Sequence, residues 1–371
     1  MQLETLELQS NSPGTRHDLQ ILRFGRPGAA PKAYIQGALH ADEVPAILVT
    51  RQLEHKLLAL EAEGKVLGEV VLVPFANPLG LSQQLMGQHQ GRFDLRDGRN
   101  FNRGFADLTD TAARAVQDAL VDDSNHNTAL IRAALRAGIQ ALAPGNHADD
   151  LRKQLLRLAI DADIVLDLHC DSDAVMHLYA LTPQRAAAEQ LGAALGAQAV
   201  LLATDSGGWP FDEACSRPWY LLQQRFAARP IDLACFAATV ELRGETDTSH
   251  ELANRDADGL IDFLRQRGVL VADEAQLVSS RCEATPLEAS EPITAPHAGV
   301  VVFHRVSGER VVAGDAIVDL VSPASGAITT LRCASGGVMY ARCGSRWAHP
   351  GKRLAKIAGT TLARSGSLLS P

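Results

Sequence analysis

Short apolar runs alternate with longer segments of helical periodicity over the first three quarters of the chain. Six runs, several almost continuous in valine, isoleucine and leucine, predict strands at residues 32–38, 69–74, 164–168, 176–181, 199–203 and 236–240. Six longer segments predict helices at residues 44–63, 128–143, 149–160, 183–195, 217–228 and 249–267. Nearly continuous apolar strands are typical of a sheet that is covered by helices on both faces. We therefore predict an α/β fold with a mixed, mostly parallel sheet flanked by helices.

The pattern changes near Leu270. Beyond residue 292 the helical patterns disappear, and short β-rich runs alternate with glycine and proline. Residues 299–318 weakly resemble residues 337–356, which suggests a small all-β domain like the barrel-sandwich fold of biotinyl and lipoyl domains. The place of their modified lysine reads Ser322-Pro-Ala-Ser-Gly326 here, so we expect a structural or access-shaping role. We predict two domains, at residues 1–272 and 273–371.

Composition narrows the class of protein. A net charge of −8 disfavours a general nucleic-acid or anionic membrane surface. No apolar run approaches the roughly 18 residues that span a bilayer, and the N-terminal residues do not resemble a signal peptide. The six cysteines are scattered, which predicts reduced thiols and a cytoplasmic location. The oligomeric state stays open, a homo-oligomer included.

Candidate chemistry gathers where the predicted strands end. His40-Ala-Asp-Glu43 follows the first strand, His169 follows the run at 164–168, and Glu241 follows the run at 236–240. Ligands of open α/β sheets collect beyond the carboxyl ends of the strands. If a helix begins at His40, then His40 and Glu43 share one face. Together with His169 they provide His, Glu and His, the ligand set of a catalytic zinc with an open position.

Each of these residues also has an ordinary structural interpretation. A His-x-x-Glu pair is common by chance, and His169 alone fits a hydrogen-bonded core histidine. Glu241 could cap the next loop or pair with Arg243. Asp167 could orient a ligand histidine or form a strand-end turn. The conjunction of four such residues at three strand ends is much more specific than any one of them.

The same residues carry a resemblance to the succinylglutamate desuccinylase and aspartoacylase family, within the zinc carboxypeptidase-like group. The metal motif His-Gly-Asp-Glu of that family appears as His40-Ala-Asp-Glu43, and its Asp-Leu-His as Asp167-Leu-His169. Its Asp-Leu-Asn-Arg segment appears as Asn100-Phe-Asn-Arg103, and its catalytic glutamate falls on Glu241. The chain departs from the family at Ala41, usually glycine, and at Asn100, usually aspartate. The second change bears on the arrangement of the substrate loop.

The resemblance implies a role for each site residue. One zinc ion per chain would be held by His40, Glu43 and His169, and would lower the pKa of water toward about 7. Glu241 would act as the proton acceptor and donor. Asn102 and Arg103 would bind a substrate carboxylate, a task that suits a planar guanidinium.

A further arginine should polarise the scissile carbonyl group. Residue spacing does not decide among Arg92, Arg96 and Arg99, and we favour Arg92 for this task. We assign Arg99 to substrate binding beside Asn102 and Arg103. The native metal stays open, because histidine and carboxylate ligands accept several first-row ions.

The resulting hypothesis is a zinc-dependent hydrolase that cleaves an amide bond in a small carboxylate-bearing substrate, an N-acyl amino acid being favoured. One alternative is a metallocarboxypeptidase that acts on short peptides or cell-wall fragments. A second alternative is a non-catalytic zinc- or ligand-binding protein with a decayed site. The sequence does not identify the acyl group or the amine.

Overall fold

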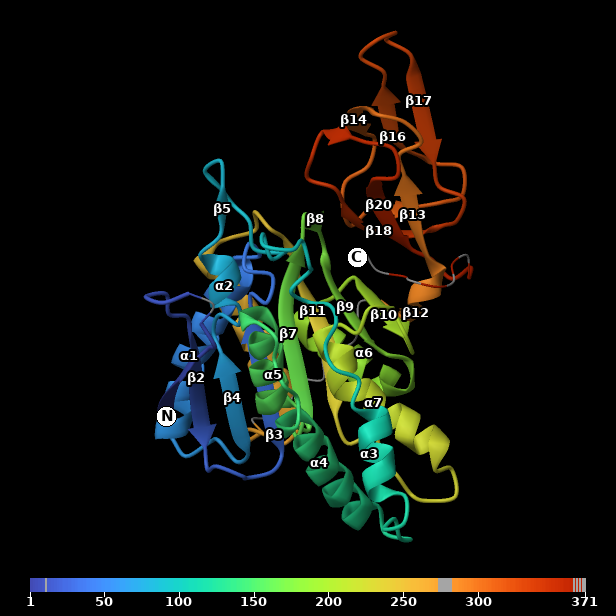
Figure 1. Ribbon diagram of the computed structural model, residues 1–371. Coiled ribbons are helices and arrows are strands. Elements are labelled where there is room, and N and C mark those ends of the chain that lie inside the picture. Colours follow the sequence, from blue (N-terminus) through green and yellow to red (C-terminus); the bar gives the residue numbers. More distant parts are fainter. Residues whose placement is uncertain (11, 273–281, 363, 365, 367, 369–371) are drawn as a thin grey trace.

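The computed structural model describes residues 1–10, 12–272, 282–362, 364, 366 and 368 (Figure 1). Its centre is a nine-stranded sheet with five parallel and three antiparallel neighbouring pairs, so the predicted mixed, mostly parallel α/β sheet is confirmed. In spatial order the strands are β1 (Gln2–Glu7), β2 (Asp18–Gly25), β4 (Glu69–Val73), β3 (Lys32–Gly37), β7 (Ile164–Asp171), β11 (Phe236–Gly244), β9 (Met176–Leu181), β10 (Ala199–Ala203) and β12 (Ala284–Pro286).

Helices cover both faces of this sheet (Figure 1). One layer contains α1 (Pro45–Ala62), α6 (Arg185–Leu195) and α8 (His250–Gln266). The other contains α3 (Thr109–Val116), α4 (Ser124–Gln140), α5 (His147–Ala159) and α7 (Phe211–Arg225). Each layer closes its own apolar cluster against the sheet. Short elements complete the region: α2 (Pro78–Leu81), η1 (Thr182–Gln184), and the hairpin β5 (Gln84–Leu85) and β6 (Gln88–His89).

The predicted strands all form, α3 is a helix that the sequence did not predict, and among the predicted helices the largest discrepancy is at α7. The sequence places this helix at residues 217–228, whereas α7 begins at Phe211 and contains Pro218 in its interior. Proline has no backbone N–H and is common in the first turn of helices, where the predicted bounds put Pro218, but in the structure it lies inside α7. The true first turn carries Asp212 and Glu213, which interact favourably with the positive end of the helix dipole.

The C-terminal region is antiparallel β structure, in two small sheets. One contains β13 (Ser290–Thr294), β20 (Arg353–Ala358), β18 (Gly337–Arg342) and β15 (Arg310–Val311). The other contains β17 (Ile328–Arg332), β16 (Ala316–Val321), β14 (Gly299–Phe303) and β19 (Trp347–Ala348). Buried residues of both sheets, among them Val301, Leu320 and Ile357, form one apolar cluster. The segment Ser322–Gly326 connects β16 to β17.

The two regions share backbone pairing at two places. The two-residue strand β8 (Asp173–Ala174), just after β7, pairs with β18 of the C-terminal region. Conversely β12, which follows the predicted domain boundary, pairs with β10 in the large sheet. The 3₁₀ turn η2 (Leu287–Ala289) comes next in the chain and leads to β13. The boundary at residues 272 and 273 borders residues outside the description, and the two-domain division stays a prediction. No helix among the described residues is long and apolar enough to cross a membrane.

Candidate active site

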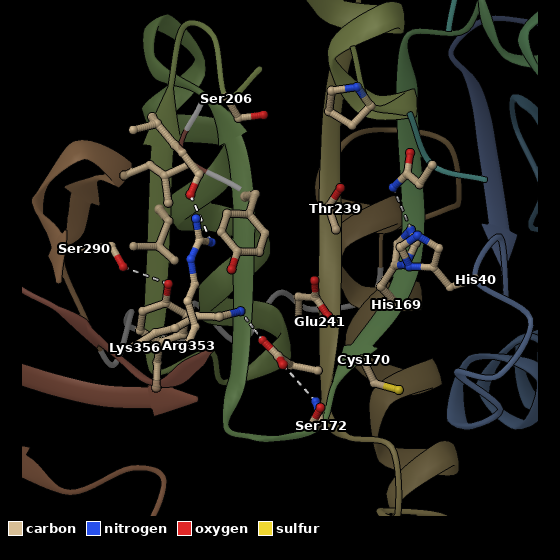
Figure 2. Close-up of a pocket in the computed structure, with 18 of the residues that line it drawn as sticks. His40, His169, Cys170, Ser172, Ser206, Thr239, Glu241, Ser290, Arg353 and Lys356 are labelled. Atoms are coloured by element: carbon tan, nitrogen blue, oxygen red, sulfur yellow. Dashed lines mark hydrogen bonds and ion pairs between the residues drawn. The ribbon is translucent and has the colours of Figure 1, made fainter. Parts of the chain in front are cut away.

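Three neighbouring strands bring the predicted chemical residues to one edge of the sheet. The chain after β3 carries His40 and Glu43, β7 carries His169, and β11 carries Glu241. β7 lies between β3 and β11, and Glu241 stands opposite His169 in the parallel ladder. Residues that stand opposite each other in adjacent strands project to the same face. Figure 2 shows His40 and His169 together, with Glu241 beside them on the neighbouring strand.

A sharp change of direction after β3 turns His40 into the site. Ala38 is fully buried and has a φ of 57°, in the left-handed region that a residue with a Cβ rarely adopts. The Glu43 N–H then donates to the His40 carbonyl at 3.1 Å, which closes a turn. The two side chains therefore face the same way through a turn that precedes α1, and not through a helix that begins at His40. Strained backbone of this kind is characteristic of functional sites.

His40, Glu43 and His169 form the group of described residues that could hold a metal ion. Nδ1 of His40 lies 2.8 Å from Oε1 of Glu43, and Nδ1 of His169 lies 2.7 Å from Oε2 of the same carboxylate. All three residues are more than nine-tenths buried. One donor atom from each residue thus faces the same small volume.

The far nitrogens of the two histidines have acceptors of their own. Nε2 of His40 lies 2.8 Å from Oδ1 of Asn100, and Nε2 of His169 lies 2.8 Å from Oδ2 of Asp167. These contacts assign the ring protons to Nε2 and leave lone pairs on both Nδ1 atoms, directed at the Glu43 carboxylate. Two lone pairs and a carboxylate facing one another repel unless a cation or protons lie between them. The donor set therefore fits a metal ion, and the outer contacts are those usual for ligand histidines.

The charges around this group favour a cation beside Glu43, either a metal ion or a proton on a histidine. Burial lowers the pKa of His40, which favours the neutral imidazole that a metal requires. Burial opposes ionisation of Glu43, yet His40 and His169 hold the pKa of its carboxyl well below the usual range. Burial likewise opposes protonation of His169, but Asp167 and Glu43 raise its pKa well above the ordinary value. Glu43 is thus an anion that requires nearby positive charge.

Glu241 differs from Glu43 because it forms no ion pair with the residues that the structure describes. Its Oε2 is buried without a hydrogen-bond partner among the described residues. Burial, reinforced by the negative charge of Glu43, raises the pKa of Glu241 to about 8. A carboxyl with a pKa near neutrality can both accept and return a proton. The alternative pairing with Arg243 does not form, because Arg243 binds Asp256 on α8.

Close contact between two loops places Arg92 beside His40 and Glu43. A Cβ on Gly91 would lie 2.2 Å from the Asp42 nitrogen, so only glycine allows this approach. Nη1 of the next residue, Arg92, lies 3.1 Å from Nδ1 of His40 and 3.2 Å from Oε1 of Glu43. Arg96 instead pairs with Asp94. Among the three candidates left open by the sequence, Arg92 is the one that lines the cavity described below.

Asn102 and Arg103 both line that cavity, but in different ways. The Asn102 side chain contacts other residues of the protein. Its Oδ1 accepts from the Phe211 N–H at 2.8 Å, and its Nδ2 lies 3.2 Å from Nε2 of His169. Arg103 is half-buried, and Nη1 donates to the Asn102 carbonyl. Arg99 is mostly exposed and pairs with Asp97; it lines a neighbouring cavity with Arg103 and Arg152. The substrate-binding roles of these residues stay predictions.

The cavity has a volume of about 340 Å³, within the range of small-molecule sites. One end is lined by His40, Glu43 and His169, and the opposite wall comes from the C-terminal β region. That wall carries side chains that the sequence did not indicate: Ser290, Tyr340, Arg353, Lys356 and Arg364. Figure 2 shows Lys356 and Arg353 across from the histidines, with Glu241 between. No local spacing links these residues to β7, so their convergence is visible only in the fold.

Asn100 and Asp212 are two further site residues that sequence reasoning did not assign. Asn100 holds His40 and also accepts from the Asn102 N–H at 2.8 Å, so the residue that departs from the family pattern has a structural use. Asp212 lines the cavity from the first turn of α7. A signal for Asn100 was present, because it aligns with a family motif. Asp212 gave none, because its helix was predicted to begin later.

Comparison with known proteins agrees with this architecture. Residues 29–133 match the model of the succinylglutamate desuccinylase/aspartoacylase catalytic domain. A succinylglutamate desuccinylase/aspartoacylase family protein from Shewanella amazonensis is 28% identical, with a TM-score of 0.82 over 96% of this chain and 98% of that one. The corresponding structure from Shewanella frigidimarina is 25% identical, with a TM-score of 0.82 over 96% of both chains.

A more distant structure shares the fold alone. The product-bound ectoine utilization protein from Ruegeria pomeroyi is 17% identical, with a TM-score of 0.67 over 97% of this chain and 95% of that one. Curated proteins give no significant match. The resemblance to the succinylglutamate desuccinylase/aspartoacylase family, predicted from the motifs, is thus confirmed by the catalytic-domain match and by the similar structures that carry this family's name.

Proposed function

We propose that this protein is a zinc-dependent hydrolase that cleaves the amide bond of a small N-acyl amino acid. The observation that carries the proposal is the convergence of two histidine Nδ1 atoms on the Glu43 carboxylate, beside the unpaired carboxyl of Glu241. The family match supports a hydrolytic deacylase. The six free cysteines favour the cytoplasm as the site of action.

One zinc ion per chain would be held by His40, Glu43 and His169. When bound, zinc supplies Lewis acidity, which lowers the pKa of water and polarises a carbonyl group. Asn100 and Asp167 hold the two imidazoles in the tautomer that leaves Nδ1 available. These buried contacts fix the ring orientations before the substrate arrives.

Glu241 accepts a proton from the attacking water while the new carbon–oxygen bond forms, and returns it to the amine nitrogen as the carbon–nitrogen bond breaks. Its raised pKa suits both steps. Arg92 donates to the oxygen that becomes negative in the tetrahedral intermediate. Arg103, half-buried in the cavity wall, binds the substrate carboxylate.

A cavity of about 340 Å³ favours a small acyl amino acid over a longer peptide chain. The decisive experiment combines metal analysis with a substrate panel. Protein purified without chelator should contain about one zinc per chain and should hydrolyse N-acyl amino acids faster than dipeptides and tripeptides. A His40→Ala, His169→Ala double variant should lose both zinc and activity.

A matched control is the His55→Ala, His126→Ala double variant, since both of these histidines are exposed and lie outside the cavity. This control should retain metal and activity. Zinc retained by the His40→Ala, His169→Ala protein would contradict the metal site. Faster cleavage of peptides would favour a metallocarboxypeptidase, and a zinc-loaded protein without hydrolytic activity on either class would favour a binding protein.

A further inference from the structure

Asp212 is a buried acid whose charge the proposed reaction does not use. It lies in the first turn of α7 and lines the cavity, yet only 6% of its surface is exposed. Its Oδ1 is buried without a hydrogen-bond partner among the described residues. A buried carboxylate oxygen with no donor is costly, because water has been removed and nothing replaces it.

The position of Asp212 relative to the reaction centre is fixed by one side chain. The Asn102 amide accepts from the Phe211 N–H at 2.8 Å and lies 3.2 Å from Nε2 of His169. The first turn of α7 is therefore hydrogen-bonded to Asn102, whose side chain packs against His169, and Asp212 directly follows Phe211 in the chain. The charge of Asp212 is close enough to interact with His169 and Asp167.

The neighbouring acid, Glu213, differs because it has a cation nearby, although its Oε2 also lacks a hydrogen-bond partner among the described residues. Its Oε1 accepts from the Ser206 N–H at 2.7 Å, and its Oε2 lies 3.9 Å from the guanidinium of Arg217. Asp212 forms no ion pair with any described residue, and its attraction to Arg103 is of longer range. Burial, with the charge of Glu213, raises the pKa of Asp212 to about 7. One carboxylate in the cavity wall is thus left without a matching cation.

Two simpler roles do not account for this geometry. A first-turn acid that only stabilises a helix dipole works equally well on the surface, as Asp110 does in the first turn of α3. A second metal site would need further ligands, and Asp212 belongs to no group of described residues that could hold a metal ion. What fits is a single positive group with hydrogen-bond donors, which an ammonium supplies.

We propose that Asp212 is a cation subsite that binds an ammonium group of the substrate. The inference rests on the proposed function and narrows its substrate class. The amine released on hydrolysis is then a basic amino acid, and the substrate is an N-acyl diamino acid whose second amino group is free. A neutral acyl amino acid of equal length leaves the Asp212 carboxylate unpaired and binds less well.

The test compares substrates that differ mainly in the terminal ammonium group. The pairs are Nα-acetylornithine with Nα-acetylnorvaline, and Nα-acetyllysine with Nα-acetylnorleucine. The zinc-loaded wild-type protein should show a kcat/KM about tenfold to a hundredfold higher for the basic member of at least one pair, as expected for one charged hydrogen bond. Asp212→Asn should bring that ratio close to one. Asp110→Asn, the exposed first-turn match, should keep the wild-type ratio.

A binding measurement separates this inference from the proposed function. Calorimetry with free L-ornithine and L-norvaline should show tighter binding of ornithine to the wild-type protein and loss of that preference in Asp212→Asn. If this pattern appears while no acyl amino acid is hydrolysed, the proposed function fails and the cation subsite stands. Equal binding of both amino acids by the wild-type protein, or an ornithine preference that survives in Asp212→Asn, overturns the subsite.

Discussion

Glu241 and His169 stand directly opposite each other on the parallel strands β11 and β7. The pairing register, and not a flexible loop, therefore fixes the position of the proposed proton carrier relative to the metal group. Sites supported by strands hold their geometry more closely than sites on loops. A substitution that keeps the size of Glu241 should change its chemistry while leaving this register intact.

Glu241→Gln should reduce kcat for N-acyl amino acids by about 10²- to 10⁴-fold, the usual contribution of a general acid–base group. Its zinc content should stay near one per chain, because His40, Glu43 and His169 are unchanged. Steady-state kinetics and elemental analysis of the same preparation check both points. Glu251→Gln, an exposed acid in the first turn of α8, is the control. Activity within a few-fold of wild type would remove Glu241 from the mechanism.

The sequence predicted the centre of the sheet better than its edge. Continuous apolar runs such as residues 164–168 indicate strands buried on both faces. In β1 every residue is exposed or half-buried, so the apolar content that identifies a strand is low there. Both β1 and β2 went unpredicted. Glu241 and His169 were found because each follows a predicted apolar run near the carboxyl end of a central strand, where α/β proteins place their chemistry.

Residues of the C-terminal wall could not be found in this way. Lys356 reaches Asp171 of β7 across 185 positions of sequence, and Tyr340 bonds Ser290. Such contacts depend on how the β region packs against the large sheet, which local periodicity does not encode. Asp212 was missed for a different reason, since the predicted helix begins at residue 217 and leaves Asp212 outside it.

Asp167→Asn should weaken zinc binding by about 10- to 100-fold, the usual cost of losing an outer partner of a ligand histidine. The Asp167 carboxylate lies 2.8 Å from Nε2 of His169 and also accepts from Gln36, all within a fully buried environment. An asparagine is neutral, so it lowers the basicity of the imidazole. Competition with a fluorescent zinc chelator measures the affinity. The control is Asp262→Asn, on the exposed face of α8, which should bind zinc as the wild type does. An unchanged zinc affinity in Asp167→Asn would mean that Asp167 has a purely structural role.

The stability of the metal-free protein should fall as pH rises. Burial and the charge of Glu43 raise the pKa of Glu241 from 4.5 to about 8 in the folded state. Between these values the folded protein holds a proton that the unfolded chain releases, so folding becomes less favourable with increasing pH and the full cost is reached above about pH 8. Chelator-treated wild type should therefore lose more thermal stability between pH 5 and pH 8 than Glu241→Gln.

This comparison isolates one group. Asp212, whose pKa is also raised, titrates in both proteins and cancels in the difference. Differential scanning calorimetry at several pH values gives both curves, and the gap between the two melting temperatures should widen in favour of the glutamine variant as pH rises. Parallel curves would mean that Glu241 has no raised pKa in the metal-free protein.

An ion pair between Lys356 and Asp171 joins the C-terminal β region to the large sheet, and we expect it to contribute to stability. Asp171 lies two residues beyond His169, and about a quarter of the Lys356 side chain remains exposed to the cavity. Lys356→Met should cost about 2 kcal/mol of unfolding free energy, between the values for exposed and fully buried pairs, because it leaves the Asp171 carboxylate without its cation. Arg185→Ala, which breaks the exposed pair with Glu189, should cost less than about 0.5 kcal/mol.

The Lys356→Met, Asp171→Asn double variant decides whether the loss comes from the uncompensated charge. Removing both partners removes both charges of this pair, so the double variant should be more stable than Lys356→Met alone. Chemical denaturation of the wild type, both single variants and the double variant completes the cycle. A double variant whose loss equals the sum of the two single losses would show that the pair is uncoupled. The β region would then be held mainly by the β8–β18 pairing and the apolar contacts around Tyr340.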